Sequence, residues 1–283
     1  MSQVIACIDA SSAMSAVVSA ASWAAERLRL PLTLLHLIED GHAAVQQDMT
    51  GNIGLGSRER LLVELAALDE QKSRLLLEQG QQLLQQAKQQ ALTQLTQSEV
   101  LLRQRHGQLA ESLAEQEADM GLVVMGVHGE QHSADGHIGS QLETVLRRIK
   151  KPILLTPDSF NAPRSVMLAF DGSGVAQKAC ELLATSPLCQ GLAVHIVYVG
   201  ETAADIEAKL DGAAQLLVNA GHEVSTTMIE GEVEPMLHHY QHQHGIDLMV
   251  MGAYGHGKLR QFFVGSTTTA MLTASKSPIL ILR

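Results

Sequence analysis

The sequence predicts an α/β protein made of two doubly wound, five-stranded parallel sheets in tandem. Three observations point to this fold class. The second half of the chain repeats motifs of the first, each half alternates short apolar runs with helical segments, and each carries a glycine motif after its fourth apolar run. With 283 residues, 46% of them hydrophobic, the chain is long and apolar enough for two domains that each bury a core.

The internal repeat rests on several independent spacings. The segment GLVVMGVHGEQHSADGHIGS at 121–140 matches DLMVMGAYGHGKLRQFFVGS at 247–266. The distance from Asp9 to His36 is 27 positions, as is the distance from Asp171 to Tyr198. Several spacings that agree at once indicate a duplication. Three further pairs of segments stay in step with these: 4–11 with 166–173, 32–39 with 193–200, and 151–157 with 277–283.

The elements follow in the same order within each half. A short apolar strand ends in an aspartate, and a serine, Ser11 or Ser173, is expected to cap the alanine-rich helix after it. A second strand, a helix, a third strand, a short helix, and the fourth and fifth strands come next. Strands that are apolar on both faces and separated by helices indicate a Rossmann-like parallel sheet covered on both sides. Such sheets bind ligands at the carboxyl ends of their strands, where the strand order reverses.

The linker and the fifth strands indicate how the halves join. The polar, proline-containing stretch TPDSFNAPR at 156–164 is typical of a linker, so we expect domains at 1–157 and 158–283. The fifth strands, PILL and PILIL, would be open apolar edges if each domain stood alone. Pairing them across a pseudo-two-fold axis hides both edges, which predicts an intramolecular pseudo-dimer. A homodimer of whole chains stays open as well.

The first half contains an insertion at about 40–97. It is 36 positions longer between His36 and Gly126 than the second half is between Tyr198 and Gly252. The insertion combines GNIGLG at 51–56, interpreted as a hinge, with a Gln- and Leu-rich helical stretch at 57–96. That helix would be ~60 Å long at ~1.5 Å per residue unless Gly80 divides it. Packing on its own domain is the simplest role, while recruiting a partner helix and covering a cleft are two others.

Charge and cysteine content exclude several classes of protein. The formal net charge of −10 argues against a general binder of nucleic acid or of anionic membranes. Cys7, Cys180 and Cys189 form no CxxC motif, so neither a disulfide framework nor a zinc knuckle is expected. The apolar stretch at 4–25 lacks the basic start of a signal peptide, and no apolar run has membrane-spanning length. The expected location is the cytoplasm, without membrane insertion.

The glycine motif, G-x2-G-x9-G-S, has the residues that a phosphate cradle needs. Glycine at a strand end lets the main chain turn tightly and approach a phosphate without a Cβ in the way. The final Gly-Ser falls where a helix should begin, and main-chain N–H groups there bind anions. A tight turn without a ligand would also use glycines, but the motif occurs twice, each time with an aspartate at the end of the first strand. Its residues are Gly126, Gly129, Gly139 and Ser140 in the first half and Gly252, Gly255, Gly265 and Ser266 in the second.

These residues resemble the universal stress protein family over nearly the whole chain, apart from the insertion. The resemblance implies ATP, or AMP or ADP, as ligand, with Mg2+ as the accompanying cation, and a dimer paired through fifth strands. It also implies that Asp171 contacts adenine through its side chain and Val199 through its main chain. The phosphate cradle of the second half would be Gly252, Gly255, Gly265, Ser266 and Thr267. The matching positions of the first half are Asp9, Leu37, Gly126, Gly129, Gly139 and Ser140.

The two halves differ around this motif. In the first half Gln141 follows Gly-Ser, whereas the second half has the hydroxyl residue Thr267. The nine-residue loop of the second half contains Lys258 and Arg260, whereas that of the first half is acidic and holds no lysine or arginine. A like charge near a polyphosphate weakens its binding. We therefore expect the second half to bind ATP more tightly, and the first weakly or not at all.

The leading functional hypothesis is an adenine-nucleotide-binding stress protein without catalysis, or with very slow ATP hydrolysis. The sequence has no Walker lysine motif, no catalytic Ser-His-Asp order and no carboxylate pair with a metal, so no catalytic residue and no enzyme activity are expected. One alternative is an interaction scaffold whose clefts have degenerated or hold another small or lipid-like ligand. The other alternative is an ATP hydrolase.

Two groups of histidines have the residue types of a metal site. His128, His132 and His137 lie with two acidic residues in the first motif loop, and His238 and His242 are i, i+4 neighbours. A solvated loop and a polar helix face explain them more simply, so we expect no metal site.

Overall fold

The structure is a computed structural model that describes residues 2–38, 55–127, 140–252, 271–272 and 274–283, with the main chain alone at 55–62 and 140. The described elements of the first half are β1 (Gln3–Ile8), α1 (Met14–Leu28), β2 (Leu32–Ile38), α2 (Leu55–Gln94), β3 (Val100–His106), α3 (Leu109–Ala114), η1 (Glu117–Asp119), β4 (Met120–Gly126), α4 (Ser140–Arg148) and β5 (Ile153–Thr156). Those of the second half are β6 (Ser165–Ala169), α5 (Gly174–Thr185), η2 (Pro187–Cys189), β7 (Ala193–Val199), α6 (Ala204–Asn219), β8 (Val224–Ile229), α7 (Val233–His244), β9 (Leu248–Gly252) and β10 (Ile279–Leu282).

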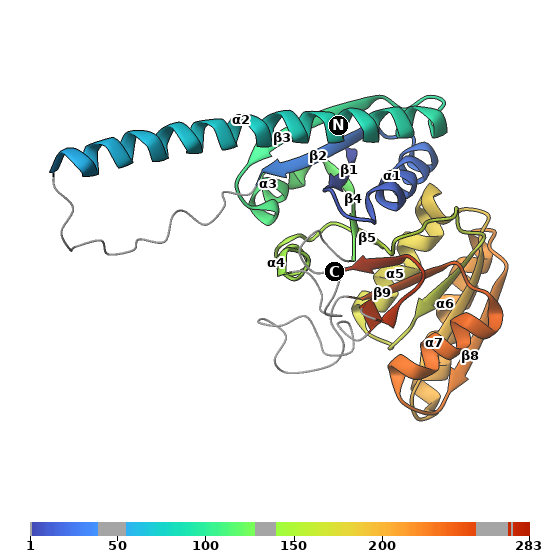
Figure 1. Cartoon of the computed structure of the whole chain (residues 1–283). Coiled ribbons are helices and arrows are strands. Elements are labelled where there is room, and N and C mark those ends of the chain that lie inside the picture. The colour runs from blue at the N-terminus through green and yellow to red at the C-terminus, as the bar shows by residue number, and fades with distance from the viewer. Residues whose placement is uncertain (1, 39–54, 128–139, 253–270, 273) are drawn as a thin grey trace.

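The ten strands in the described part of the chain form one continuous sheet (Figure 1). Its order is β3-β2-β1-β4-β5-β10-β9-β6-β7-β8, so each half contributes five neighbouring strands. Every neighbouring pair is parallel except β5 and β10. In each half the chain builds outward from a central strand, β1 or β6, first on one side and then on the other. This arrangement confirms the predicted tandem of doubly wound domains.

The antiparallel pair β5 and β10 joins the halves. Leu154 lies opposite Leu280, and Ile153 lies opposite Ile281. These four side chains are at most 1% exposed, so the join is part of the core. Two strands that would be sticky edges in isolated domains thereby close each other. The predicted pairing through the fifth strands is confirmed.

Side chains alternate along each strand between two cores, one on each face of the sheet. In β1, for example, Val4 and Ala6 point into the core under α1, α2, α5 and α6, whereas Ile5 points into the core under α3, α4 and α7. Each core runs across the β5–β10 join and includes residues of both halves. The molecule is therefore a three-layer α/β/α arrangement whose two halves share both cores.

The first helices of the two halves begin differently. Ser173 caps α5 as predicted, because its Oγ accepts a hydrogen bond from the main-chain N–H of Ala176 at 3.2 Å. The same prediction for Ser11 is wrong. The cap of α1 is Ala13, which makes no side-chain capping hydrogen bond, and the hydroxyl of Ser11 donates to Asp9 instead. A carboxylate is a stronger acceptor for that hydroxyl than a neutral group would be.

Helix α2 is one continuous 40-residue helix, so Gly80 does not divide it. Its C-terminal part packs on its own domain through Leu84, Ala87 and Ala91, all of which are buried. Every side chain at 63–75 is exposed, and Figure 1 shows this part of the helix extending away from the sheet. No helix in the described ranges is long and apolar enough to cross a membrane.

Gly80 is the point where α2 comes closest to the sheet. A Cβ at this position would stand 2.2 Å from Nε2 of Gln104 and 2.5 Å from Cδ2 of His36. The glutamine amide can swing away, but Nδ1 of His36 is hydrogen-bonded to the carbonyl of Ile8 at 2.8 Å, which holds the ring in place. Glycine therefore permits the helix to lie against β2 and β3.

We expect Gly80→Val to lower the free energy of unfolding by ~1–3 kcal/mol, because the new side chain overpacks the contact with His36. The matched control is Gly212→Val in α6, where a Cβ would meet no atom within 4 Å. That change should alter the free energy by less than ~0.5 kcal/mol. Urea denaturation followed by far-UV circular dichroism measures both, and equal stability of the two variants would contradict the described packing of α2.

Candidate functional site

The candidate site lies at the carboxyl ends of the central strands, where the strand order reverses. Asp9 directly follows β1, which lies between β2 and β4, and Asp171 follows β6, which lies between β7 and β9. Adjacent loops diverge to opposite sides of the sheet at such a point and leave a crevice between them. Both aspartates predicted from the sequence therefore stand where a doubly wound sheet binds its ligands.

Asp171 is held in a fixed orientation by its own turn. Its Oδ1 accepts a hydrogen bond from the main-chain N–H of Ser173 at 3.0 Å, and Gly172 adopts a φ of +70° that suits glycine. Within the described residues, Oδ2 makes no hydrogen bond. The carboxylate is half-buried and retains acceptor capacity for an amino or hydroxyl group of a ligand.

Val199 presents its main chain to the same crevice. The N–H of Phe170 donates to the carbonyl of Val197 at 2.9 Å, and the N–H of Gly200 donates to the carbonyl of Ile229 in β8 at 2.9 Å. Alternate residues of a parallel strand direct their polar main-chain groups to the same neighbour. The polar main-chain groups of Val199 therefore point toward β6, as those of Val197 do. They lie beyond the end of that strand.

Leu37 of the first half is arranged in the same way. The N–H of Gly107 donates to the carbonyl of Ile38 at 3.1 Å, so Ile38 faces β3 and Leu37 faces the side of β1. Since β1 ends at Ile8, the main-chain groups of Leu37 lie beside the space next to Asp9. The duplicated sequence thus produces a duplicated main-chain geometry.

The described part of the glycine motif lies on the same edge. Gly126 and Gly252 are the last residues of β4 and β9, in register with Thr156 and Leu282. Ser140 is the first residue of α4, as the sequence predicts for the end of the motif. The other motif residues fall outside the described residues: Gly129, Gly139, Gly255, Gly265, Ser266 and Thr267.

The aspartates of the two halves differ in how fully they are satisfied. Oδ1 of Asp9 accepts two hydrogen bonds from Ser11, one from its main-chain N–H at 3.2 Å and one from its hydroxyl at 2.5 Å. Among the described residues, Asp171 receives one hydrogen bond, from the main-chain N–H of Ser173, whose hydroxyl serves as helix cap instead. The first-half carboxylate therefore has less acceptor capacity left for a ligand.

Lys209 is a cation at the second-half crevice that sequence reasoning missed. Helix α6 crosses the turn after β6, so a Cβ on Gly172 would lie 2.9 Å from Cδ1 of Ile206 and 3.7 Å from Nζ of Lys209. In the first half, the matching turn residue Ala10 is exposed. Lys209 forms an i, i+4 ion pair with Asp205 at 3.8 Å, which is typical of any solvated helix. This spacing does not indicate that α6 packs over the turn after β6.

Helix α7, which carries His238 and His242, also contributes His244 to a cluster of aromatic rings. The rings of Tyr240 and His244 are 4.1 Å apart, and Nδ1 of His195 lies 3.1 Å from the hydroxyl of Tyr240. Burial lowers the pKa of His195, the nearby His244 lowers it further, and Glu223 opposes them. Among the described residues, no group of three or more His, Cys, Asp or Glu side chains could hold a metal ion. The loop histidines at 128–139 lie outside those residues.

The three thiols do not offer a nucleophile. Burial raises the pKa of Cys7 to about 12, with a smaller contribution from the negative charge of Asp9. Burial also raises the pKa of Cys180 to about 11 and that of Cys189 to about 12. The thiolate is the reactive form. Cys180 and Cys189 are buried and Cys7 is half-buried, and the raised pKa makes each of them a poor nucleophile.

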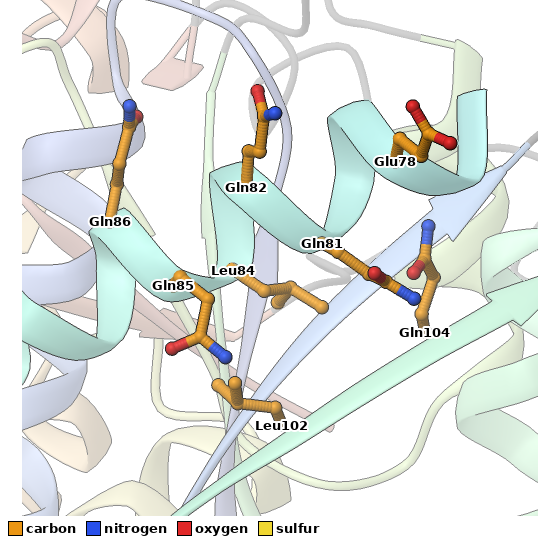
Figure 2. Close-up of a pocket in the computed structure, with 8 residues that line it drawn as sticks. All are labelled: Glu78, Gln81, Gln82, Leu84, Gln85, Gln86, Leu102 and Gln104. Carbon is orange, nitrogen blue, oxygen red and sulfur yellow. The ribbon is translucent and has the colours of Figure 1, made fainter. Parts of the chain in front are cut away.

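A separate hollow lies between α2 and the edge strand β3, away from the predicted cleft (Figure 2). Leu84 and Leu102 form its apolar part, and glutamine side chains surround them. It is open to solvent and contains none of the residues predicted from the glycine motif. Its lining consists of Glu78, Gln81, Gln82, Leu84, Gln85, Gln86, Leu102 and Gln104.

Comparisons with known proteins agree with this architecture. The sequence model of the universal stress protein family matches residues 1–157 and again residues 163–283. A universal stress protein of Synechocystis sp. is 33% identical over 288 residues, which cover 100% of both chains. A crystal structure of a universal stress protein from Archaeoglobus fulgidus has a TM-score of 0.73 at 18% identity and covers 99% of this chain and 96% of its own. A putative universal stress protein from Pseudomonas aeruginosa has a TM-score of 0.62 at 16% identity, with 99% and 92% covered.

We expect the native protein to resist alkylation by iodoacetamide at pH 8, because its thiols are almost entirely protonated. The reaction should be at least ~100-fold slower than that of an exposed cysteine such as Leu92→Cys, and urea should release all three thiols. Mass spectrometry of the time course measures this. Rapid labelling of any native cysteine in the folded protein would contradict the burial described.

Proposed function

The chain belongs to the universal stress protein family and carries its domain twice, and on that premise we propose that it binds an adenine nucleotide, ATP foremost, at the carboxyl end of β6. The observation that carries the proposal is that the Asp171 carboxylate and the main-chain groups of Val199 both follow strands at the point where the strand order reverses. Adenine has an amino donor beside a ring-nitrogen acceptor, and these match a carboxylate or carbonyl beside an N–H.

The phosphates would lie toward β9, over the glycine motif that begins at Gly252. Main-chain N–H groups of such a motif stabilise phosphate oxygens, and nearby cations add to this. Lys209 on α6 and, by sequence, Lys258 and Arg260 supply positive charge in this half. An accompanying Mg2+ would be held by phosphate oxygens and water, because the described residues contain no metal-binding cluster of their own.

The second domain is proposed to be the tighter nucleotide site. Its aspartate keeps more acceptor capacity than Asp9, and its turn lies beside an ammonium group, whereas the matching turn at Ala10 is exposed. The acidic loop of the first half, with Glu130 and Asp135, would repel a polyphosphate. These differences all act in the same direction.

We expect Asp171→Ala to weaken ATP binding by ~10-fold or more, because a hydrogen bond to a charged group contributes ~1.5–3 kcal/mol. Asp9→Ala is the matched control in the first half and should leave the tighter dissociation constant unchanged. Isothermal titration calorimetry of ATP, ADP, AMP and GTP into both variants measures affinity and base preference. If Asp9→Ala alone abolished binding, the assignment to the second domain would be wrong.

We also propose that ATP acts as a ligand that the protein holds rather than consumes. The sequence offers no Walker lysine and no motif that would activate a water molecule, which supports this role. In a single-turnover assay with excess protein, we expect the bound ATP to remain intact over many minutes, with Mg2+ and with a chelator alike. Mg2+-dependent release of phosphate that Asp171→Ala removes would identify an ATP hydrolase instead.

A further inference from the structure

Helix α7 is attached to the sheet of the second half by a narrow face. Of its 12 residues, Leu237, Tyr240 and Gln241 are buried. The side chains of Leu237 and Tyr240 belong to the core on that side of the sheet. Most helices in proteins are stabilised by packing an apolar face. Because the apolar face of α7 is small, the polar contacts of Tyr240 contribute to holding the helix in place.

The Tyr240 hydroxyl joins α7 to polar side chains of β7 and of β8, the strand at the edge of the sheet. It lies 3.1 Å from Nδ1 of His195 in β7 and 3.1 Å from Oγ1 of Thr227 in β8. The hydroxyl of Ser225 in β8 lies 3.0 Å from the same ring nitrogen. The ring of His244 lies 4.1 Å from that of Tyr240 and 5.6 Å from that of His195. We call these five residues the His195 cluster.

The hydrogen bonds of the His195 cluster are complete when Nδ1 of His195 carries no proton. This nitrogen then accepts from the hydroxyls of Tyr240 and Ser225, and the Tyr240 oxygen accepts from Thr227. Every hydroxyl in the cluster thereby donates to a partner. A proton on Nδ1 turns this acceptor into a donor, so the hydroxyls of Tyr240 and Ser225 can no longer donate to it and both must rotate.

The groups around His195 also disfavour a positive charge on its ring. Burial lowers the pKa of His195 below its ordinary value of 6.5, and the nearby His244 lowers it further. Glu223, directly before β8, opposes them with the smallest effect, and its side chain is exposed. Tyr240 and His244 are the titratable residues of α7 that contact the ring, and the neighbour in β6 is the apolar Met167. Geometry and surroundings therefore both favour neutral His195.

His238, on α7 itself, acts in the same direction. Its Nε2 is buried and has no hydrogen-bond partner among the described residues. Burial lowers the pKa of this histidine too, and Glu234 opposes the effect. If both ring nitrogens carried a proton, a buried N–H would lack an acceptor, which weakens packing. Protonation of either histidine therefore makes the packed position of α7 less stable.

We propose that the His195 cluster is a pH-sensitive attachment that releases the C-terminal part of α7 from the edge of the sheet in acid. Above pH 6.5 His195 is neutral whether α7 is packed or released, and the attachment has its full stability. As the pH falls below 6.5, the released form binds the proton first, so the attachment weakens until packed His195 is protonated as well. Release exposes Tyr240, which α7 otherwise buries against the sheet.

Hydrogen exchange of the full chain, followed by mass spectrometry and corrected for the intrinsic exchange rate, tests the proposal. From pH ~7.5 to ~5, amide protection in α7 should fall ~5-fold or more, and that in α1 less than ~2-fold. His195→Gln, which binds no proton in this range, should remove more than half of the loss in α7. The control His239→Gln, at an exposed position of α7, should keep it. No loss in the parent chain, an equal loss in α1, or a loss that His195→Gln leaves more than half intact would overturn the proposal.

Two further measurements test the cluster without replacing His195. Tyr240→Phe keeps the ring and removes the hydroxyl, so it should lower the protection of α7 at pH ~7.5 at least ~3-fold and leave that of α1 unchanged. In the parent chain, NMR titration of the His195 ring should give a pKa below 6.5. Unchanged protection in Tyr240→Phe, or a His195 ring that titrates at or above 6.5, would refute the proposed attachment. Neither result depends on nucleotide binding, since the cluster contains no residue of that site.

Discussion

The antiparallel contact between β5 and β10 is the constraint on which the rest of the molecule depends. Leu154 and Leu280 face each other at its centre, and the sheet continues through them from one domain to the other. Because both cores run across this join, neither domain presents its fifth strand to solvent. The join also orients the halves, and the central strands β1 and β6 each lie where the strand order reverses. The fold and the pair of candidate sites therefore have the same origin.

The two crevices share a main-chain plan but differ in their side chains. Leu37 and Val199 direct their polar groups in the same way, since strand pairing determines that geometry. The two sites differ in the side-chain hydrogen bonds and the helices around this shared main chain. The Ser11 hydroxyl is used by Asp9, whereas the Ser173 hydroxyl is used by a helix, and α6 lies over the second turn alone. Differences of this kind change ligand affinity without changing the fold.

Much of the fold could be predicted because strand order in a doubly wound sheet follows from the alternation of apolar runs and helices. The duplicated spacing from Asp9 and Asp171 also placed both aspartates at the correct sheet edge. Predictions were less secure where one side chain had two possible hydrogen-bond partners. Ser11 could bond to a carboxylate or to a helix end, and local sequence does not rank the two. The position of Lys209 depends on how α6 packs, a tertiary relation that spacing along the chain does not contain.

Gly80 is a second position at which tertiary packing, and not local sequence, determines the structure. Its low helix propensity suggested a break in α2, but the close approach to His36 requires a residue without a side chain. Tertiary packing thus overrode the local preference. The length of the helix was predictable from its composition, whereas the exposure of residues 63–75 was not, because that depends on where the sheet ends. The reading of the histidines as a polar helix face missed the ring contacts of Tyr240 with His244 and His195.

The connection of both halves in one polypeptide has a consequence for how this protein can evolve. In a dimer of identical subunits every substitution appears twice, so a change that spoils one crevice spoils both. Here the linker at 157–164 keeps the halves at a high effective concentration, and a substitution enters one crevice alone. The carboxyl-end residues of one half are then free to change while those of the other stay as they are, and the join at Leu154 and Leu280 maintains the architecture throughout.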